Sequence, residues 1–242
     1  MYERCPVKGS ILLVFAHPDD ESFGLAGTIL KYTRQGVPVD LICATKGERG
    51  LRLDVPDNVD TGTAREAELR CAAAILGIRD IYFLGYIDAD LDKAPVDEVT
   101  NKVLGIMQKV QPAVVITFGP DGVSRHPDHI ATGKAATIAY KKMITEDSRP
   151  AKLYYVTLPA SLVPNAAELG IVTRPDDEVT TTIDITGFLD LKIQAVACHR
   201  SQQDARQFIQ MLRQDKAAVF ASKEFLYLAS PASRAKESDL FQ

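Results

Sequence analysis

The chain has 242 residues, 25% of them charged, and a formal net charge of -4 at pH 7. This length allows one α/β domain, residues 1–242, with a full hydrophobic core. Lysine and arginine are spread along the chain rather than clustered, which argues against a nucleic-acid partner. The apolar run at residues 11–16 is too short to span a bilayer and no secretory signal precedes it, so we expect no membrane span and a cytoplasmic location.

The four cysteines are widely scattered, at Cys5, Cys43, Cys71 and Cys198, and they form no C-x-x-C pair. This spacing favours free, mostly buried thiols over a disulfide framework or a structural zinc site. We therefore expect no function from them.

The first predicted strand, residues 11–16, stops abruptly at the polar sequence H-P-D-D-E. A buried run that ends in this way is typical of a parallel strand that delivers polar side chains to one edge of a sheet. Proline followed by carboxylates suits the first turn of a helix, which we place at residues 21–35. His17 and Asp20 are three residues apart across this turn and could reach one point, with Asp19 between them.

Strand-like and helix-like segments alternate along the rest of the chain. In order, the sequence predicts a strand at 37–47, a surface loop at 51–60, a helix over 63–76 capped by Thr61, a strand at 81–86, a helix at 96–110, a strand at 113–119, a helix at 128–145, a strand at 152–158, a loop to 175, a strand at 180–185, two helices and a strand at 225–228. This alternation predicts an α/β fold with a Rossmann-like, mostly parallel sheet flanked by helices on both faces. No G-x-G-x-x-G follows the first strand and no P-loop motif occurs, so neither kind of nucleotide site is expected.

The sequence H-P-D-H at residues 126–129 repeats the first polar motif after another predicted strand. Ligands of open α/β sheets bind at the carboxyl ends of the strands, so the two motifs should meet. If His17, Asp20 and His129 bind one cation, the ligand set leaves an open position, as in catalytic zinc sites. Zinc lowers the pKa of a bound water to about 7, and Asp19 could act as general base while that water attacks a carbonyl.

His126 is the imidazole available to stabilise an oxyanion and to protonate a leaving nitrogen, and Asp128 could orient or charge it through a hydrogen bond. Taken singly, a histidine or aspartate at a helix start is usually a cap or a surface residue. The chain has only four histidines, however, and the H-P-D signature occurs twice at separate strand ends. This repetition favours the catalytic interpretation.

These motifs resemble those of the zinc-dependent LmbE-like or PIG-L-like de-N-acetylases, whose members remove acetyl from N-acetylglucosamine in glycosylphosphatidylinositol, mycothiol and bacillithiol precursors and in chitobiose. The resemblance rests on A-H-P-D-D-E and H-P-D-H, and it extends to T-K-G-E-R-G from Thr45, A-R-E-x-E at 64–68, L-G-Y-x-D at 84–88 and H-R-S-Q at 199–202. It implies the same fold, the same metal ligands, base and oxyanion residue, and Zn²⁺ as cofactor, with Fe²⁺ as the alternative.

By the same resemblance, Arg65 and Asp88 correspond to positions that hold sugar hydroxyls, which suits groups that offer paired hydrogen bonds. The simpler interpretations are a surface partner of Glu68 for Arg65 and a turn residue for Asp88. Glu48 is placed near the site by topology alone. His199 is either a partly buried histidine or a rim residue that touches substrate, and we favour the rim.

The expected function is a hydrolase that removes the N-acetyl group from a small amino-sugar substrate of the N-acetylglucosamine type. An amidase of a thiol-sugar conjugate would use the same residues. Two histidines and a carboxylate also serve non-haem iron enzymes, and a sugar-binding protein without turnover is a third hypothesis. The loops at 51–60 and 161–177 differ from those of bacterial thiol-pathway members, so we expect them to set substrate choice. A homo-oligomer is compatible with the sequence.

Overall fold

The strands of the chain form one seven-stranded sheet in the order β3-β2-β1-β4-β5-β7-β6. The computed structural model describes residues 9–146, 151–214 and 218–242. The strands are β1 (Ile11–Phe15), β2 (Val39–Thr45), β3 (Asp80–Tyr86), β4 (Val114–Phe118), β5 (Lys152–Val156), β6 (Thr181–Asp184) and β7 (Lys223–Ser230). The first five are parallel, and β7 runs antiparallel to both β5 and β6. The predicted mostly parallel sheet is confirmed.

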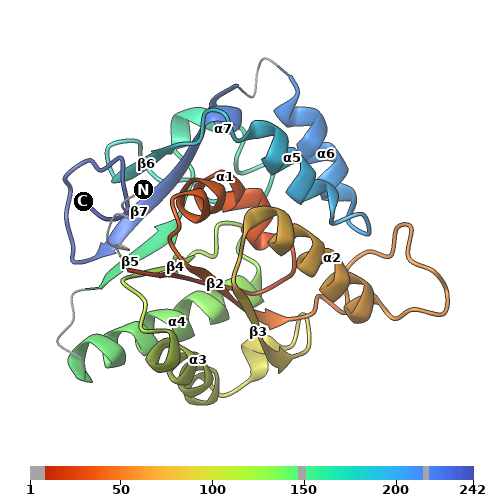
Figure 1. The fold of residues 1–242 in the computed structure, drawn as a ribbon, viewed down its shortest axis with the longest axis horizontal. Helices are drawn as coiled ribbons and strands as arrows, with labels where there is room; N and C mark the ends of the chain where they lie inside the picture. The colour runs from red at the N-terminus through yellow and green to blue at the C-terminus, as the bar shows by residue number, and fades with distance from the viewer. Residues whose placement is uncertain (1–8, 147–150, 215–217) are drawn as a thin grey trace, which may run out of the picture.

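Helices cover both faces of this sheet (Figure 1). They are α1 (Asp20–Arg34), α2 (Thr61–Leu76), α3 (Val96–Val110), α4 (Pro127–Glu146), α5 (Leu189–Ala197), α6 (Gln203–Leu212) and α7 (Ala218–Ser222), with short 3-10 turns η1 (Leu91–Lys93) and η2 (Ala160–Leu162). Helices α3 and α4 pack together on one face, while α1, α2 and α5 pack on the other. None of the helices in the described ranges is both long and apolar enough to cross a membrane.

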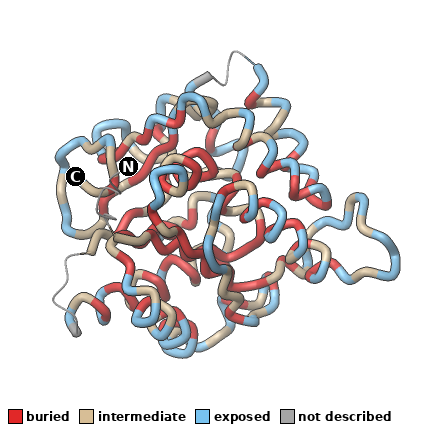
Figure 2. Tube along the Cα trace, viewed as in Figure 1, coloured by how far each residue is buried: buried red, intermediate tan, exposed pale blue. Residues whose placement is uncertain are grey.

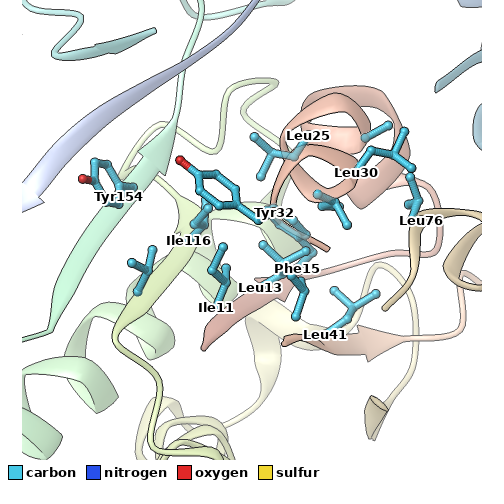
Figure 3. Packing of buried hydrophobic residues seen from close by; sticks show 14 of the residues in the cluster. Ile11, Leu13, Phe15, Leu25, Leu30, Tyr32, Leu41, Leu76, Ile116 and Tyr154 are labelled. Atoms are coloured by element: carbon cyan, nitrogen blue, oxygen red, sulfur yellow. The ribbon is translucent and has the colours of Figure 1, made fainter. Parts of the chain in front are cut away.

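The core consists of two apolar layers separated by the sheet. Alternate residues of β1 serve the two layers because successive side chains of a strand point to opposite faces. Ile11, Leu13 and Phe15 join the layer under α1 and α2, which Figure 3 shows, and Leu12 and Val14 join the layer under α3 and α4. All five are at most 1% exposed. The continuous apolar run of the sequence therefore reflects burial on both faces.

The strand order reverses between β1 and β4, which are neighbours in the sheet although two strands separate them in sequence. The open crevice of such a sheet lies at the carboxyl ends of these two strands. The loop at residues 51–60 protrudes beside α2 and is largely exposed, whereas the central strands are buried (Figure 2). Helix α2 is capped by Asp60, whose carboxylate accepts a hydrogen bond from the Thr63 amide at 2.9 Å, and not by Thr61 as expected.

The expectation of free cysteines is wrong for one pair. Cys71 in α2 and Cys198 after α5 form a disulfide, with Cα atoms 5.8 Å apart and a sequence separation of 127 positions. The pairing follows from the packing of α2 against α5, which the spacing of the cysteines does not reveal. Cys43 is free and buried as expected, and Cys5 lies outside the described residues.

The tight contact between α1 and the segment after β6 should make the free energy of unfolding sensitive to substitution of Gly27. A Cβ added to Gly27 would approach the side chain of Ile185 to 2.6 Å. Gly27→Ala should therefore lower the free energy of unfolding by about 1–3 kcal/mol, because the overlap outweighs the better helix propensity of alanine. At Gly105 in α3 a Cβ would meet nothing within 4 Å. Gly105→Ala should therefore raise the free energy of unfolding by about 0.5–1 kcal/mol. Urea unfolding followed by circular dichroism measures both, and equal effects would contradict the prediction.

Candidate metal centre and active site

The two polar motifs meet at the carboxyl ends of β1 and β4. His17 follows β1 and His129 lies in the first turn of α4, and the Nδ1 atom of His17 is 3.2 Å from the Nε2 atom of His129. Asp20 at the start of α1 completes the cluster, with Oδ1 3.3 Å from His129 Nε2 and Oδ2 4.0 Å from His17 Nδ1. Imidazole nitrogens at 2.0–2.1 Å from a tetrahedral zinc ion lie about 3.3 Å apart. The distances from His129 to His17 and to Asp20 therefore match ligands of one ion, while the distance between His17 and Asp20 is longer.

Hydrogen bonds behind the trio determine which nitrogen of each imidazole faces the centre. The Nδ1 atom of His129 lies 3.0 Å from the Gly122 carbonyl oxygen, so it carries the proton and donates, and Nε2 keeps its lone pair. The Nε2 atom of His17 lies 3.1 Å from a carboxylate oxygen of Asp88 and 3.2 Å from one of Asp128, so Nδ1 keeps its lone pair. Outer hydrogen bonds of this kind are usual for metal-binding histidines.

The carboxylate of Asp20 is oriented in a similar way by the backbone. Its Oδ2 atom accepts hydrogen bonds from the amides of Ala16 at 3.1 Å and His17 at 2.8 Å, which leaves Oδ1 to face His129. Three atoms with available lone pairs thus converge. Such an arrangement is repulsive unless a cation lies among them, so the donor set fits a bound metal ion.

The charge state of the cluster supports this conclusion. Burial lowers the pKa of His17, but the hydrogen bonds to Asp128 and Asp88 outweigh burial and raise it to about 10. Burial raises the pKa of Asp20, but the charge and hydrogen bond of His129 outweigh burial. The pKa of Asp20 therefore lies well below its usual range. Both shifts favour positive charge at this site, which a bound metal ion would also supply.

Other groups at this end of the sheet also come close enough to share an ion. His17, His126 and His129 present ligand atoms within 4.8 Å of one another, as do His17, Asp88 and Asp128. In the second set both carboxylates contact the Nε2 side of His17, where the proton lies. We therefore regard Asp88 and Asp128 as hydrogen-bond partners that orient His17 rather than as ligands. His126 lies beside the three predicted ligands.

Asp19 occupies a constrained position beside Asp20. Its backbone has φ 115°, a left-handed conformation that non-glycine residues rarely adopt. Arg65 donates hydrogen bonds to an Asp19 carboxylate oxygen at 2.9 Å and to the Pro18 carbonyl at 2.6 Å, and Glu21 accepts one from the Asp19 amide at 3.1 Å. Burial raises the pKa of Asp19 to about 6, against the opposing charge of Arg65. This carboxylate can both lose and regain a proton near neutral pH.

His126 and Asp128 do not interact as expected. The Asp128 carboxylate hydrogen-bonds to His17 and to the Ala89 amide, at 3.2 and 2.7 Å, and not to the ring of His126. Instead the backbone amide of Asp128 donates to Nδ1 of His126 at 3.2 Å, which leaves the proton on Nε2. Burial, followed by the charge of His17, lowers the pKa of His126. A neutral His126 is thus a hydrogen-bond donor at this site.

The predicted substrate-binding residues fall into two groups. Arg65 and Asp88 line a cavity next to His17, Asp20 and His129. Arg65 also hydrogen-bonds to Asp19, a contact that the sequence did not predict. Glu48 does not line the cavity, and its carboxylate accepts a hydrogen bond from the Asp88 amide at 3.0 Å. The rim position expected for His199 is wrong, because its side chain is 0% exposed.

The sequence reasoning missed the supporting residues around the site. Glu21 is fully buried and its carboxylate lies 3.0 Å from Nε2 of His199, so the two motifs that contain them are joined inside the protein. The ring of Phe118 stacks on His129 with centroids 4.1 Å apart. Glu21 belongs to the A-H-P-D-D-E motif and Phe118 ends β4, but neither signal reveals a partner far away in sequence.

A cavity of about 900 Å³ opens from the metal cluster. Its lining includes the predicted ligands together with Asp19 and His126, and it continues over the ends of β5 and β7, the loop after β5, and α6. Of the two loops expected to govern substrate choice, residues 161–177 contribute to this lining and residues 51–60 do not. A small organic molecule fits a cavity of this size.

The sequence matches a family model described as PIG-L: GlcNAc-PI de-N-acetylase over residues 12–140. The probable N-acetyl-alpha-D-glucosaminyl L-malate deacetylase 2 of Bacillus cereus is 38% identical over 199 residues, which cover 81% of this chain and 84% of that protein. The 1D-myo-inositol 2-acetamido-2-deoxy-alpha-D-glucopyranoside deacetylase of Acidothermus cellulolyticus is 33% identical to this chain, and the match covers 96% of this chain and 94% of that protein.

Solved structures share the fold at lower identity. The N,N'-diacetylchitobiose deacetylase of Pyrococcus horikoshii superposes with a TM-score of 0.67 at 24% identity, over 90% of this chain and 83% of its own. GalB, the 4-carboxy-2-hydroxymuconate hydratase of Pseudomonas putida KT2440, gives a TM-score of 0.70 at 21% identity, over 93% of this chain and 97% of its own. With more than half of its length matched by the family model and two curated relatives above 30% identity, this chain belongs to the PIG-L family of GlcNAc-PI de-N-acetylases.

Proposed function

We propose that this chain is a metal-dependent hydrolase that removes the N-acetyl group from an N-acetylglucosamine-type substrate. The observation that carries the proposal is the approach of His129 Nε2 to His17 Nδ1 and to Asp20 Oδ1, at 3.2 and 3.3 Å, among residues that line a cavity. Both curated relatives are named as deacetylases of N-acetylglucosamine-type glycosides. Family membership and the geometry thus support the same reaction.

His17, Asp20 and His129 would hold the ion, and we propose Zn²⁺ because two imidazoles and one carboxylate with an open position suit a catalytic zinc. Ferrous iron is the alternative metal for the same ligands. When bound, the ion supplies positive charge that polarises the amide carbonyl and makes a coordinated water more acidic. The outer hydrogen bonds from His17 to Asp88 and Asp128 would keep the ligand orientation fixed.

Asp19 is the proposed general base. Its carboxylate lies next to the ligand Asp20, lines the cavity and has a pKa raised to about 6, so it is mostly ionised at neutral pH and can accept a proton at a carboxylate oxygen. The hydrogen bond from Arg65 keeps that carboxylate in place without closing the cavity. We propose that Arg65 acts chiefly by positioning Asp19.

His126 is proposed to stabilise the oxyanion that forms as the amide carbonyl is attacked. Its Nδ1 atom accepts the Asp128 amide, so Nε2 carries a hydrogen-bond donor, and the lowered pKa keeps the ring neutral. Protonation of the leaving nitrogen by His126 stays a prediction. Asp88 lines the cavity and is proposed to contact a sugar hydroxyl, while a cytoplasmic location and a homo-oligomer also stay predictions.

Replacing the base should separate catalysis from metal binding. Asp19→Asn should lower kcat for acetate release by about 10²- to 10⁴-fold, because the amide cannot accept the proton, while the metal content of the purified protein stays the same. Asp92→Asn, in an exposed turn of η1, is the matched control and should leave both quantities unchanged. Full activity of Asp19→Asn would remove this residue as the base.

The support of His17 can be tested through metal affinity. Asp128→Asn should weaken Zn²⁺ binding by about 10- to 100-fold, because the neutral amide no longer polarises the imidazole. Asp90→Asn serves as control, since that aspartate pairs with Arg49 and Lys93 instead. Competition with a chelator of known affinity measures both variants, and equal affinities would argue against the assignment.

Metal removal tests the need for a metal ion, and the oxygen dependence of the reaction distinguishes the hydrolase from an iron oxygenase. Dialysis against a chelator should abolish acetate release from N-acetylglucosamine conjugates, and added Zn²⁺ or Fe²⁺ should restore it. The reason is that the reaction needs a metal ion to polarise the carbonyl and to activate water. Acetate release should proceed equally well without oxygen. Activity that survives complete metal removal, or that requires oxygen, would contradict the proposal.

A further inference from the structure

The cavity has an apolar half that the proposed chemistry does not use. Beyond the metal cluster it is walled by side chains from five separate segments, namely Phe23, Val156, Leu162, Leu169, Phe208 and Met211. Leu169 is 58% exposed although it lines the cavity. Apolar side chains gathered around a cavity gain free energy when an apolar group covers them.

This apolar half is continuous with the metal cluster. Phe23 lies one helical turn after the ligand Asp20 in α1, and its ring is 5.0 Å from that of Phe208 in α6. On the other side, the Val172 amide donates a 2.6 Å hydrogen bond to the Val123 carbonyl, which fastens the loop after β5 beside the segment that leads to His126. A substrate held at the cluster would therefore extend between these walls.

Two charged residues in the lining of the cavity are paired with each other. Lys192 and Glu224 are 2% and 3% exposed and form an ion pair at 2.7 Å. Glu224 also accepts the amides of Gly27 and Thr28, at 3.0 and 2.7 Å. This buried pair therefore offers no free charge to a ligand. The lining also contains polar side chains, among them Asn165, Asp204 and Gln214.

We propose, on the basis of the proposed deacetylase function, that the substrate carries an alkyl or aryl substituent on the amino sugar and that this substituent fills the apolar half of the cavity. The two curated relatives are named for L-malate and myo-inositol glycosides, which carry polar groups instead. The substituent could be the aglycone or a longer N-acyl chain. Both present the same apolar surface to the cavity.

Acetate release from methyl and octyl N-acetyl-D-glucosaminides, in both anomers and below the micelle concentration, tests the aglycone. Each buried methylene strengthens binding roughly fourfold, so kcat/KM should be at least about tenfold higher for one octyl glycoside than for its methyl partner. Release of octanoate from N-octanoylglucosamine, compared with acetate from N-acetylglucosamine, tests the acyl chain. A preference in either series supports the proposal and identifies the source of the apolar group.

A matched pair of variants locates the preference. Leu169→Ser should reduce the ratio of kcat/KM for the octyl glycoside to that for the methyl glycoside severalfold, or the corresponding ratio for the octanoyl and acetyl compounds. Leu51→Ser should leave the ratio unchanged, because Leu51 is similarly exposed, at 50%, but does not line the cavity. Calorimetric binding of both glycosides to Asp19→Asn provides a readout without turnover, and it should show the same preference in Kd.

The two proposals fail in different ways. Acetate release with equal kcat/KM in both series, or equal Kd values, would overturn the apolar subsite and leave the deacetylase standing. Tighter binding of the octyl glycoside without acetate release from any of these compounds would support the subsite and contradict the deacetylase. An unchanged octyl preference in Leu169→Ser, together with a loss in Leu51→Ser, would overturn the assignment of the wall.

Discussion

The site depends on the pairing of β1 with β4, because this contact brings together ligands from segments 112 residues apart. The register pairs Ile11 with Val114 and Leu13 with Ile116, so the two strands end level with each other. His17, just after the end of β1, therefore lies close to the first turn of α4, which contains His129. A slip in register would separate the lone pairs that face each other at 3.2 Å and remove the cation site. The buried apolar residues of β1, which hold the register, are therefore as necessary as the ligands.

The sequence predicts the fold and the meeting of the two H-P-D motifs well because both are encoded locally. Apolar runs that end in polar residues mark the carboxyl ends of parallel strands, and the repeated H-P-D signature marks the two ends that meet. What the sequence does not reveal depends on contacts between distant segments. The disulfide requires α2 to pack against α5, the burial of His199 requires Glu21 as its partner, and the Asp128 carboxylate finds His17 rather than the neighbouring His126. None of these pairs is visible in the spacing of residues along the chain.

The family motif that contains His199 acts from inside the protein. His199 contacts the carboxylate of Glu21, which in turn accepts the amide of Asp19, whose left-handed backbone costs of order 1–3 kcal/mol. Two residues further, the amide and hydroxyl of Ser201 donate to Glu68 in α2 at 2.8 and 2.7 Å. Buried polar groups that satisfy one another in this way hold a single arrangement. The strain at the base is thus offset by a network that reaches across α1, α2 and the segment after α5.

The groups proposed to carry out the reaction lie mostly on other segments than the groups proposed to select the substrate. The proposed metal ligands and base lie between the end of β1 and the start of α1 and in the first turn of α4, which follow two neighbouring parallel strands. The apolar walls come from α1 just after Asp20, the end of β5, the loop after it and α6. A fold does not determine its reaction, and here a hydratase shares this one with a TM-score of 0.70. Changes in the loop after β5 and in α6 can alter the apolar wall while the polar turns stay intact, because neither segment carries a proposed ligand.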